Sequence, residues 1–168
     1  MNRNIFSLPV AFFVYLFLQV VFFHRLVLFD TAFCLAYIGF ILFLPITFTP
    51  VVVMLLGFAL GFSIDFFQNS QGLHASAAVF IGFIRNFWLD RITPQGGYDV
   101  AGDQPFATFG AQWFLFYTIP LLLLHHLVLF FVEAGGFSMT GLTLAKAIFS
   151  FVFTFVTLFL YRFVLVRR

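Results

Sequence analysis

The sequence predicts an all-α integral membrane protein in which six transmembrane helices form a compact bundle. Of its 168 residues, 63% are hydrophobic and only 8% are charged, and the mean hydropathy is +1.11. Soluble domains carry roughly 25% charged residues. Six apolar runs approach the length of about 20 residues that a helix needs to cross a bilayer. Because the connections between these runs are short, residues 1–168 are expected to form a single transmembrane domain.

The six runs are long and continuous, which favours helices over the short alternating strands of a membrane β-barrel. The first run follows a basic N-terminal residue and lacks a small-residue cleavage site, so we expect it to be retained rather than removed as a signal peptide. The second and third runs are separated only by the segment PITFTP, which must turn tightly at a membrane face. In chain order the runs are Ile5–Phe23, Thr31–Phe48, Pro50–Phe67, Leu73–Leu89, Ala111–Val132 and Leu142–Val166.

The distribution of Lys and Arg predicts that both termini lie in the cytoplasm, because cytoplasmic loops carry an excess of basic residues. With that orientation, the turn Gln68–Gly72 lies on the outer face and the longest loop, Asp90–Pro105, lies in the cytoplasm. Six basic residues are then cytoplasmic and two are outside. The six are Arg3, Arg85, Arg91, Arg162, Arg167 and Arg168, and the two are Arg25 and Lys146.

The third and fourth runs are expected to form a helical hairpin. Gly57, Gly61 and Asp65 are spaced at i, i+4 and i+8, which places them on one helical face beside which another backbone can approach closely. Gln68–Gly72 supplies polar turn residues. Small residues again share one face of the returning helix, so the two helices can pack tightly; they are Ala75, Ala78 and Gly82.

Asp65 is the acidic residue of this hairpin, and an acid within a transmembrane run is a candidate functional residue. At a helix centre it costs about 2.5 to 3.5 kcal/mol on the insertion scale, so a compensating partner is expected. Three alternatives remain open. Asp65 forms a buried ion pair with Lys146, which has a similar predicted depth; it is hydrogen-bonded or neutral at the hairpin; or it handles a proton or a ligand.

The last run carries a stripe of small and polar residues with steps of three and four, so the stripe faces the bundle interior. Its hydroxyls can bond across helices or back to carbonyls of their own helix. Packing of the bundle explains the stripe without a ligand, and a polar pathway for a solute is the alternative. The stripe consists of Thr143, Ala147, Ser150, Thr154, Thr157 and Tyr161.

Histidines and the lone cysteine do not form a metal pattern. His125 and His126 are adjacent, so their side chains point about 100° apart on a helix and cannot chelate one metal ion as an i, i+4 pair does. A metal or haem would need further ligands, and only His24 and His74 remain. Cys34 lies in an apolar run, where a thiol simply packs. No metal and no cofactor are expected.

An intramembrane hydrolase would need a nucleophile beside a base, and the one cluster that offers both surrounds the hairpin turn. It contains Ser70, Ser76 and His74, with Asp65 nearby. No glycine-framed serine and no H-E-x-x-H pattern accompanies it. We therefore do not expect an enzyme.

The hairpin resembles a known family. The G-x-x-x-G-x-x-x-D run of Gly57, Gly61 and Asp65, followed by a polar turn and by G-L-H-A from Gly72, including His74, is similar to the hairpin of the rod shape-determining protein MreD. The segment TPQGGYD at 93–99 and the HHLVLFF run at 125–131 resemble MreD proteins of the Bacteroidetes branch. Length and the expected six spans agree over essentially the whole chain.

The resemblance implies a non-enzymatic inner-membrane subunit that scaffolds lateral peptidoglycan synthesis. The implied partners are membrane lipids and MreC, a bitopic protein with a large periplasmic part. The implied indirect partners, reached through MreC, are the elongation glycosyltransferase, the elongation transpeptidase and the cytoskeletal protein MreB. No nucleic-acid partner is implied. Family membership would mark Gly57, Gly61, Asp65, Gly72 and His74 as motif or partner-interface positions. The MreD fold also resembles the substrate-binding subunits of energy-coupling-factor vitamin transporters, which provides the alternative function.

Overall fold

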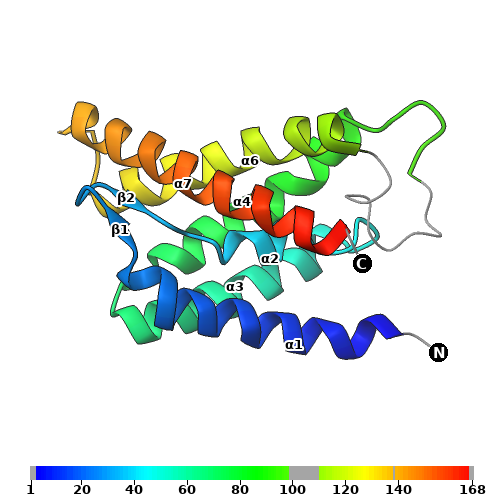
Figure 1. The fold of residues 1–168 in the computed structure, drawn as a ribbon, viewed down its shortest axis with the longest axis horizontal. Helices are drawn as coiled ribbons and strands as arrows, with labels where there is room; N and C mark the ends of the chain where they lie inside the picture. The colour runs from blue at the N-terminus through cyan, green and yellow to red at the C-terminus, as the bar shows by residue number, and fades with distance from the viewer. Residues whose placement is uncertain (1–2, 99–109, 138, 167–168) are drawn as a thin grey trace.

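The computed structural model describes residues 3–98, 110–137 and 139–166, and the side chains of residues 7–98, 110–137 and 139–161. Part of the predicted cytoplasmic loop, residues 99–105, lies outside the described residues, as do Arg167 and Arg168. Five long helices dominate the fold (Figure 1). They are α1 (Arg3–Phe17), α3 (Pro50–Gln68), α4 (Leu73–Arg91), α6 (Gly110–Glu133) and α7 (Thr140–Val166).

Four helical stretches of the described chain are long and apolar enough to cross a membrane. The chain is therefore a helical membrane protein, as its composition predicts. Helix α4 is as long as α3 but is not among the four, because His74, Arg85 and Asn86 make it more polar. The predicted set of six transmembrane helices is not confirmed. The four stretches are Ser7–Arg25, Pro50–Gln68, Gly110–Glu133 and Thr140–Tyr161.

The prediction of one helix over Thr31–Phe48 is wrong. After α1, a π-helical turn η1 (Leu18–Phe22) and a 3-10 turn η2 (Phe23–Arg25) lead into two short antiparallel strands, β1 (Val27–Leu28) and β2 (Ala32–Phe33). Val27 pairs with Phe33 and Leu28 with Ala32. The chain then runs without regular structure to a short helix, α2 (Ile38–Leu42). An apolar run by itself does not distinguish a membrane helix from an irregular segment buried inside a bundle.

Helix α2 forms the centre of the molecule (Figure 1). All five of its residues are buried, which is the environment expected for a helix that is apolar all round. Helices α1 and α3 lie on one side of α2 and helices α6 and α7 on the other, and α4 packs against both α3 and α6. Non-helical backbone at membrane depth is tolerated only where protein or water surrounds it. The burial of this segment meets that condition.

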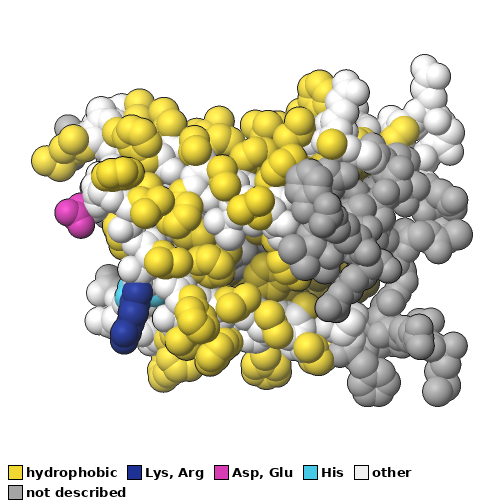
Figure 2. Space-filling view, in the orientation of Figure 1, with side chains coloured by type: hydrophobic (Ala, Val, Ile, Leu, Met, Phe, Trp, Pro, Cys, Tyr) yellow, Lys and Arg dark blue, Asp and Glu magenta, His cyan; other side chains and the backbone are white. Residues whose placement is uncertain are grey.

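The first turns of α1 and the last turns of α7 lie at the same end of the bundle, and the β1–β2 and α3–α4 turns lie at the other end (Figure 1). This arrangement agrees with termini on one side of the membrane, although one of the return passes is not a long helix. Hydrophobic side chains cover the face in Figure 2, and its coloured charged side chains lie at the end of the two turns. We call this end the turn end.

Candidate functional site

The α3–α4 hairpin closes around Asp65. Asn69 ends α3 in the left-handed region at φ +55°, and Gly72 precedes α4 at φ +89°. The carboxylate of Asp65 accepts backbone N–H groups of His74 at 3.0 Å and of Ala75 at 2.8 Å, and the hydroxyl of Ser70 at 2.5 Å. Asp65 thus caps the first turn of the following helix, whose own N-cap residue has no side chain.

The predicted glycine face packs inside the protein. A Cβ atom built on Gly61 would lie 2.6 Å from the backbone of His74 and Ala75, and one built on Gly57 would lie 3.1 Å from the carbonyl oxygen of Ala78. Close approach of α3 to α4 therefore requires glycine at position 61 and leaves little room for a side chain at position 57. The face that we considered for a partner is occupied by the chain's own hairpin.

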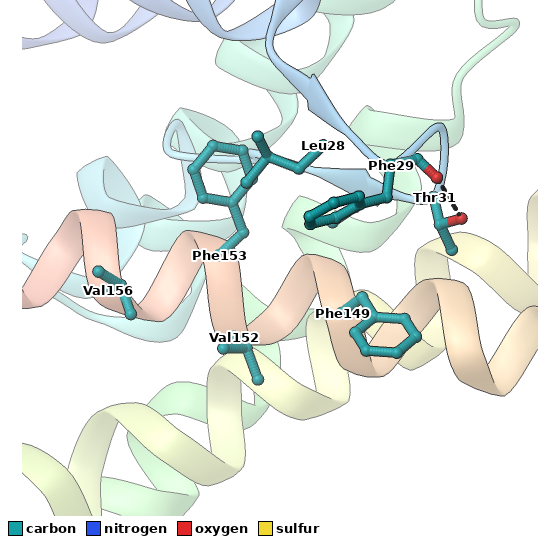
Figure 3. A pocket seen from close by; sticks show the side chains of 8 residues that line it. Leu28, Phe29, Thr31, Phe149, Val152, Phe153 and Val156 are labelled. Carbon is teal, nitrogen blue, oxygen red and sulfur yellow. Dashed lines mark hydrogen bonds between the residues drawn. The ribbon is translucent and has the colours of Figure 1, made fainter.

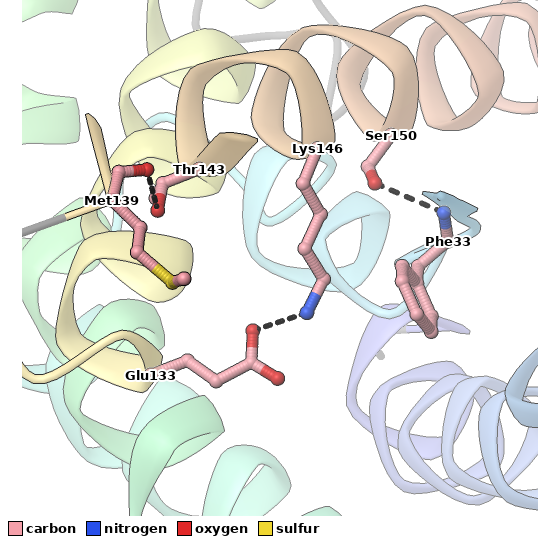
Figure 4. Close-up of polar contacts among 6 residues, drawn as sticks. All are labelled: Phe33, Glu133, Met139, Thr143, Lys146 and Ser150. Atoms are coloured by element: carbon pink, nitrogen blue, oxygen red, sulfur yellow. Dashed lines mark hydrogen bonds and ion pairs between the residues drawn. The ribbon is translucent and has the colours of Figure 1, made fainter. Parts of the chain in front are cut away.

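The Asp65–Lys146 ion pair, one of the three alternatives for Asp65, is not formed between the described side chains. The ammonium group of Lys146 instead donates to Glu133 at 2.6 Å, between the start of α7 and the end of α6 (Figure 4). It also lies 4.8 Å from the ring centre of Phe33 and 4.7 Å from that of Phe130. The structure thus favours the alternative in which Asp65 is hydrogen-bonded at the hairpin, since that carboxylate already accepts three hydrogen bonds.

The polar stripe of α7 binds the end of β2 and the irregular segment that follows it. The hydroxyl of Ser150 accepts the N–H of Phe33 at 2.9 Å (Figure 4), and that of Thr154 accepts the N–H of Leu35 at 2.9 Å. These hydroxyls replace the hydrogen bonds that a helix would have supplied.

Gln19, in the π-helical turn η1, also forms hydrogen bonds with the backbone of this irregular segment. Its amide donates to the carbonyl of Cys34 at 3.0 Å and accepts the N–H of Tyr37 at 3.1 Å. Together with the α7 stripe it explains how a strand and a loop can lie buried among helices.

The buried histidines meet hydroxyl groups of other elements. The Tyr37 hydroxyl lies 2.8 Å from Nε2 of His125 and 3.2 Å from Nδ1 of His74. His126 lies 2.8 Å from the carbonyl of Leu122 and 3.1 Å from the Thr154 hydroxyl. Each adjacent histidine thus has its own partner, as the 100° offset predicts, and Tyr37 connects the hairpin to α6. No group of three potential metal ligands occurs among the described residues.

The two serines at the hairpin turn bond to groups other than the His74 ring in the described chain. Ser70 donates to Asp65, Ser76 donates to the carbonyl of Leu73 in its own helix at 2.9 Å, and the ring of His74 faces Tyr37. Neither serine hydroxyl has a hydrogen bond to the His74 ring among the bonds of the described chain. The Ser70 hydroxyl thus adds a third donor to the Asp65 carboxylate that caps α4.

Arg85, which the predicted orientation counts among the cytoplasmic basic residues, also has a structural role. It is fully buried in α4. Its Nε donates to the Tyr117 hydroxyl at 2.7 Å and another guanidinium nitrogen donates to the carbonyl of Leu44, while Tyr117 donates to the carbonyl of Leu42 at 2.9 Å. These bonds hold the end of α2. An arginine within an apolar run is the sequence signal for such a role.

Among the hollows lined by described residues, three are considered for ligands or partners. The polar pocket, about 220 Å³, lies at the turn end, and residues from all the passes that meet there line it, including Gln19, His24, Gln68, His74, Glu133 and Lys146. The strand groove, about 560 Å³, is apolar and lies between the β1–β2 turn and α7 (Figure 3); Leu28, Phe29 and Phe153 line it. The hairpin groove, about 680 Å³, runs along α3 and α4; Met54, Phe58, Phe62, Ala75, Ser76 and Phe80 are among its lining residues.

Comparison with models of protein families, with curated proteins and with solved structures finds no match to this chain. Fold and site define the class: a helical membrane protein with a tightly closed α3–α4 hairpin and a polar pocket beside it.

Proposed function

We propose that this protein is a non-enzymatic scaffold subunit of the bacterial cell-elongation machinery, similar to MreD, that resides in the inner membrane with both termini in the cytoplasm. One observation carries the proposal: the residues on which the resemblance to MreD rests act together to form the α3–α4 hairpin. Gly57 and Gly61 bring the two helices together, Asp65 caps the second helix, and Gly72 makes the turn. Each motif position thus has a physical reason to be the residue that it is.

The hairpin groove is the surface that we propose for MreC. The small residues Ala75 and Ser76 of α4 and phenylalanines of α3 and α4 line it. Within a membrane, small residues let two helix backbones approach closely, which strengthens packing where no hydrophobic drive exists. A bitopic partner such as MreC has a single transmembrane helix to place there. MreC would in turn connect the protein to the elongation glycosyltransferase, the elongation transpeptidase and MreB.

The vitamin-transporter alternative receives less support. The hydroxyls of Ser150 and Thr154, which a solute pathway would use, already accept backbone N–H groups of the chain. The polar pocket, at about 220 Å³, lies below the range of about 300 to 1,000 Å³ that drug-sized ligands occupy. The two larger hollows are lined mainly by apolar side chains, which offer a vitamin few hydrogen-bonding groups.

The test is affinity purification of the tagged protein from its native membrane. We expect MreC to co-purify with the wild-type protein and to be lost from Ser76→Leu, which fills the hairpin groove from an exposed position. Leu142→Phe is the matched control, because Leu142 is 70% exposed on α7, away from this groove. Co-purification of an ATPase module with a bound vitamin, without MreC, would instead support the transporter.

A further inference from the structure

The polar pocket contains hydrogen-bonding groups that the fold leaves unused. Nε2 of Gln68 is buried and has no hydrogen-bond partner within the described chain. His74 directs Nδ1 to the Tyr37 hydroxyl, and its Nε2 has no hydrogen bond among those of the described residues. Buried polar groups are nearly always paired in native proteins, and an orphaned one needs an explanation. A ligand in this pocket would provide the partner of the Gln68 amide.

The pocket also presents one positive and one negative group. Lys146 and Glu133 both line it, with their charged atoms 2.6 Å apart, and their side chains are 28% and 42% exposed. Figure 4 shows Lys146 reaching from α7 to Glu133 at the end of α6. A ligand with a single charge that pairs with Lys146 or Glu133 in place of its present partner would leave the other member unpaired. A ligand with both charges can pair with each member at once.

We propose that this pocket binds a small zwitterion, a molecule with a primary ammonium group and a carboxylate or phosphate on a short chain. The anionic group would lie at Lys146 and the Gln68 amide, and the ammonium group at Glu133. The volume of about 220 Å³ suits a molecule of this size. Two sources share this chemistry: a free solute of the amino-acid type and the headgroup of phosphatidylethanolamine. The proposal is independent of the scaffold function.

Binding is measured on the purified full-length protein, by thermal unfolding and by isothermal titration calorimetry, without MreC. We use phosphoethanolamine and β-alanine as zwitterions, and ethylamine and propionate as probes with one charge. In a second arm, the delipidated protein is placed in nanodiscs of phosphatidylglycerol with phosphatidylethanolamine or with phosphatidylcholine, whose headgroup lacks a primary ammonium. We expect a zwitterion, either as a free solute or as the phosphatidylethanolamine headgroup, to raise the melting temperature of the protein. The singly charged probes should leave that temperature unchanged.

Two variants test the contacts. Gln68→Met removes an amide nitrogen that has no partner, so it should leave the melting temperature of the ligand-free protein unchanged while weakening zwitterion binding at least tenfold. The double variant Glu133→Gln with Lys146→Gln removes both charges at nearly constant volume and should also abolish binding. Gln112→Met is the matched control, because Gln112 is exposed at the start of α6, at the opposite end of the bundle.

Each outcome decides the proposal. Binding of the free zwitterions supports a soluble ligand, and stabilisation only in phosphatidylethanolamine nanodiscs supports a lipid headgroup. No effect of a zwitterion in either arm would overturn the proposal, as would equal binding by the wild type and Gln68→Met. Because MreC is absent from the assay, a negative result leaves the proposed scaffold function intact.

Discussion

Asp65 shows how a single carboxylate can be stabilised in a membrane protein without a cation. Its two oxygens accept two backbone N–H groups at the start of α4 and one hydroxyl. The N-terminus of a helix carries unpaired donors and a partial positive charge, and both favour an anion there. The compensation that the sequence analysis sought in Lys146 is provided by backbone dipoles.

Asp65→Asn is expected to destabilise the protein by about 1 to 3 kcal/mol, because an amide has one acceptor oxygen and leaves a buried donor unpaired. The free energy of unfolding would be measured by denaturant titration in detergent. Ser63→Ala is the control: the Ser63 hydroxyl is exposed and bonds only to the carbonyl of Ala59 in its own helix. Equal stability of Asp65→Asn and the wild type would show that the cap contributes nothing.

The partners of Asp65 and Lys146 also determine how their substitutions combine. Since Lys146 pairs with Glu133, the effects of Asp65→Asn and Lys146→Met should add, within about 0.5 kcal/mol. A double-mutant cycle on unfolding free energies measures this. For Glu133 and Lys146, which are partly exposed, we expect a coupling of at most about 1 kcal/mol. A large coupling between Asp65 and Lys146 would contradict the observed geometry.

At the scale of the element, the α3–α4 hairpin depends on glycine at its contact face. Gly61→Ala should destabilise the protein by about 1 to 3 kcal/mol, because the added methyl group would meet backbone atoms that cannot move aside. Gly57→Ala should cost less, since its nearest contact is 3.1 Å rather than 2.6 Å. Thermal unfolding of the purified variants measures which of the two substitutions lowers the stability more.

Gly141→Ala is the matched control for these two glycines. Gly141 is the second residue of α7 and has no atom within 4 Å of a built Cβ, so alanine is expected to be accommodated there without loss of stability. A loss of stability in Gly141→Ala equal to that in Gly61→Ala would attribute the effect to glycine in helices generally, and not to the hairpin contact.

The α7 stripe and the irregular segment likewise form one unit. Ser150→Ala and Thr154→Val should each destabilise the protein by about 1 to 3 kcal/mol, because each leaves a backbone N–H of Phe33 or Leu35 without its acceptor. Thr157→Val should have a smaller effect, since its hydroxyl bonds mainly to the carbonyl of Phe153 in its own helix. Unfolding in detergent measures all three. Unchanged stability with loss of vitamin uptake would favour the transporter.

At the scale of the whole molecule, the helices fix which positions share a side of the membrane. Asn69 and Thr140 lie at the turn end, and Gln95 follows α4 at the opposite end. In cells carrying Cys34→Ala, cysteines introduced at Asn69 or Thr140 should react with an impermeant thiol reagent, and one at Gln95 should be shielded. Labelling at Gln95 with protection at the other two positions would invert the predicted orientation.

Much of the fold could be predicted because apolar length is a local property. The predicted runs Pro50–Phe67, Leu73–Leu89, Ala111–Val132 and Leu142–Val166 each agree within two residues at either end with α3, α4, α6 and α7. The spacing of glycines and the polar turn likewise predicted the closed hairpin. Apolar runs and polar turns are each made of consecutive residues, so they can be recognised in the sequence. The thickness of the bilayer sets the length that a membrane-spanning run must have.

The sequence alone therefore determined the membrane class, four of the long helices and the hairpin contact. Only the tertiary structure decided the path of residues 27–48, the separate partners of Asp65 and Lys146, the burial of Arg85 and the position of the polar pocket. The physical reason is that a buried backbone group must find a partner, and that partner can lie far along the chain. Ser150 is 117 residues from Phe33, whose N–H it accepts.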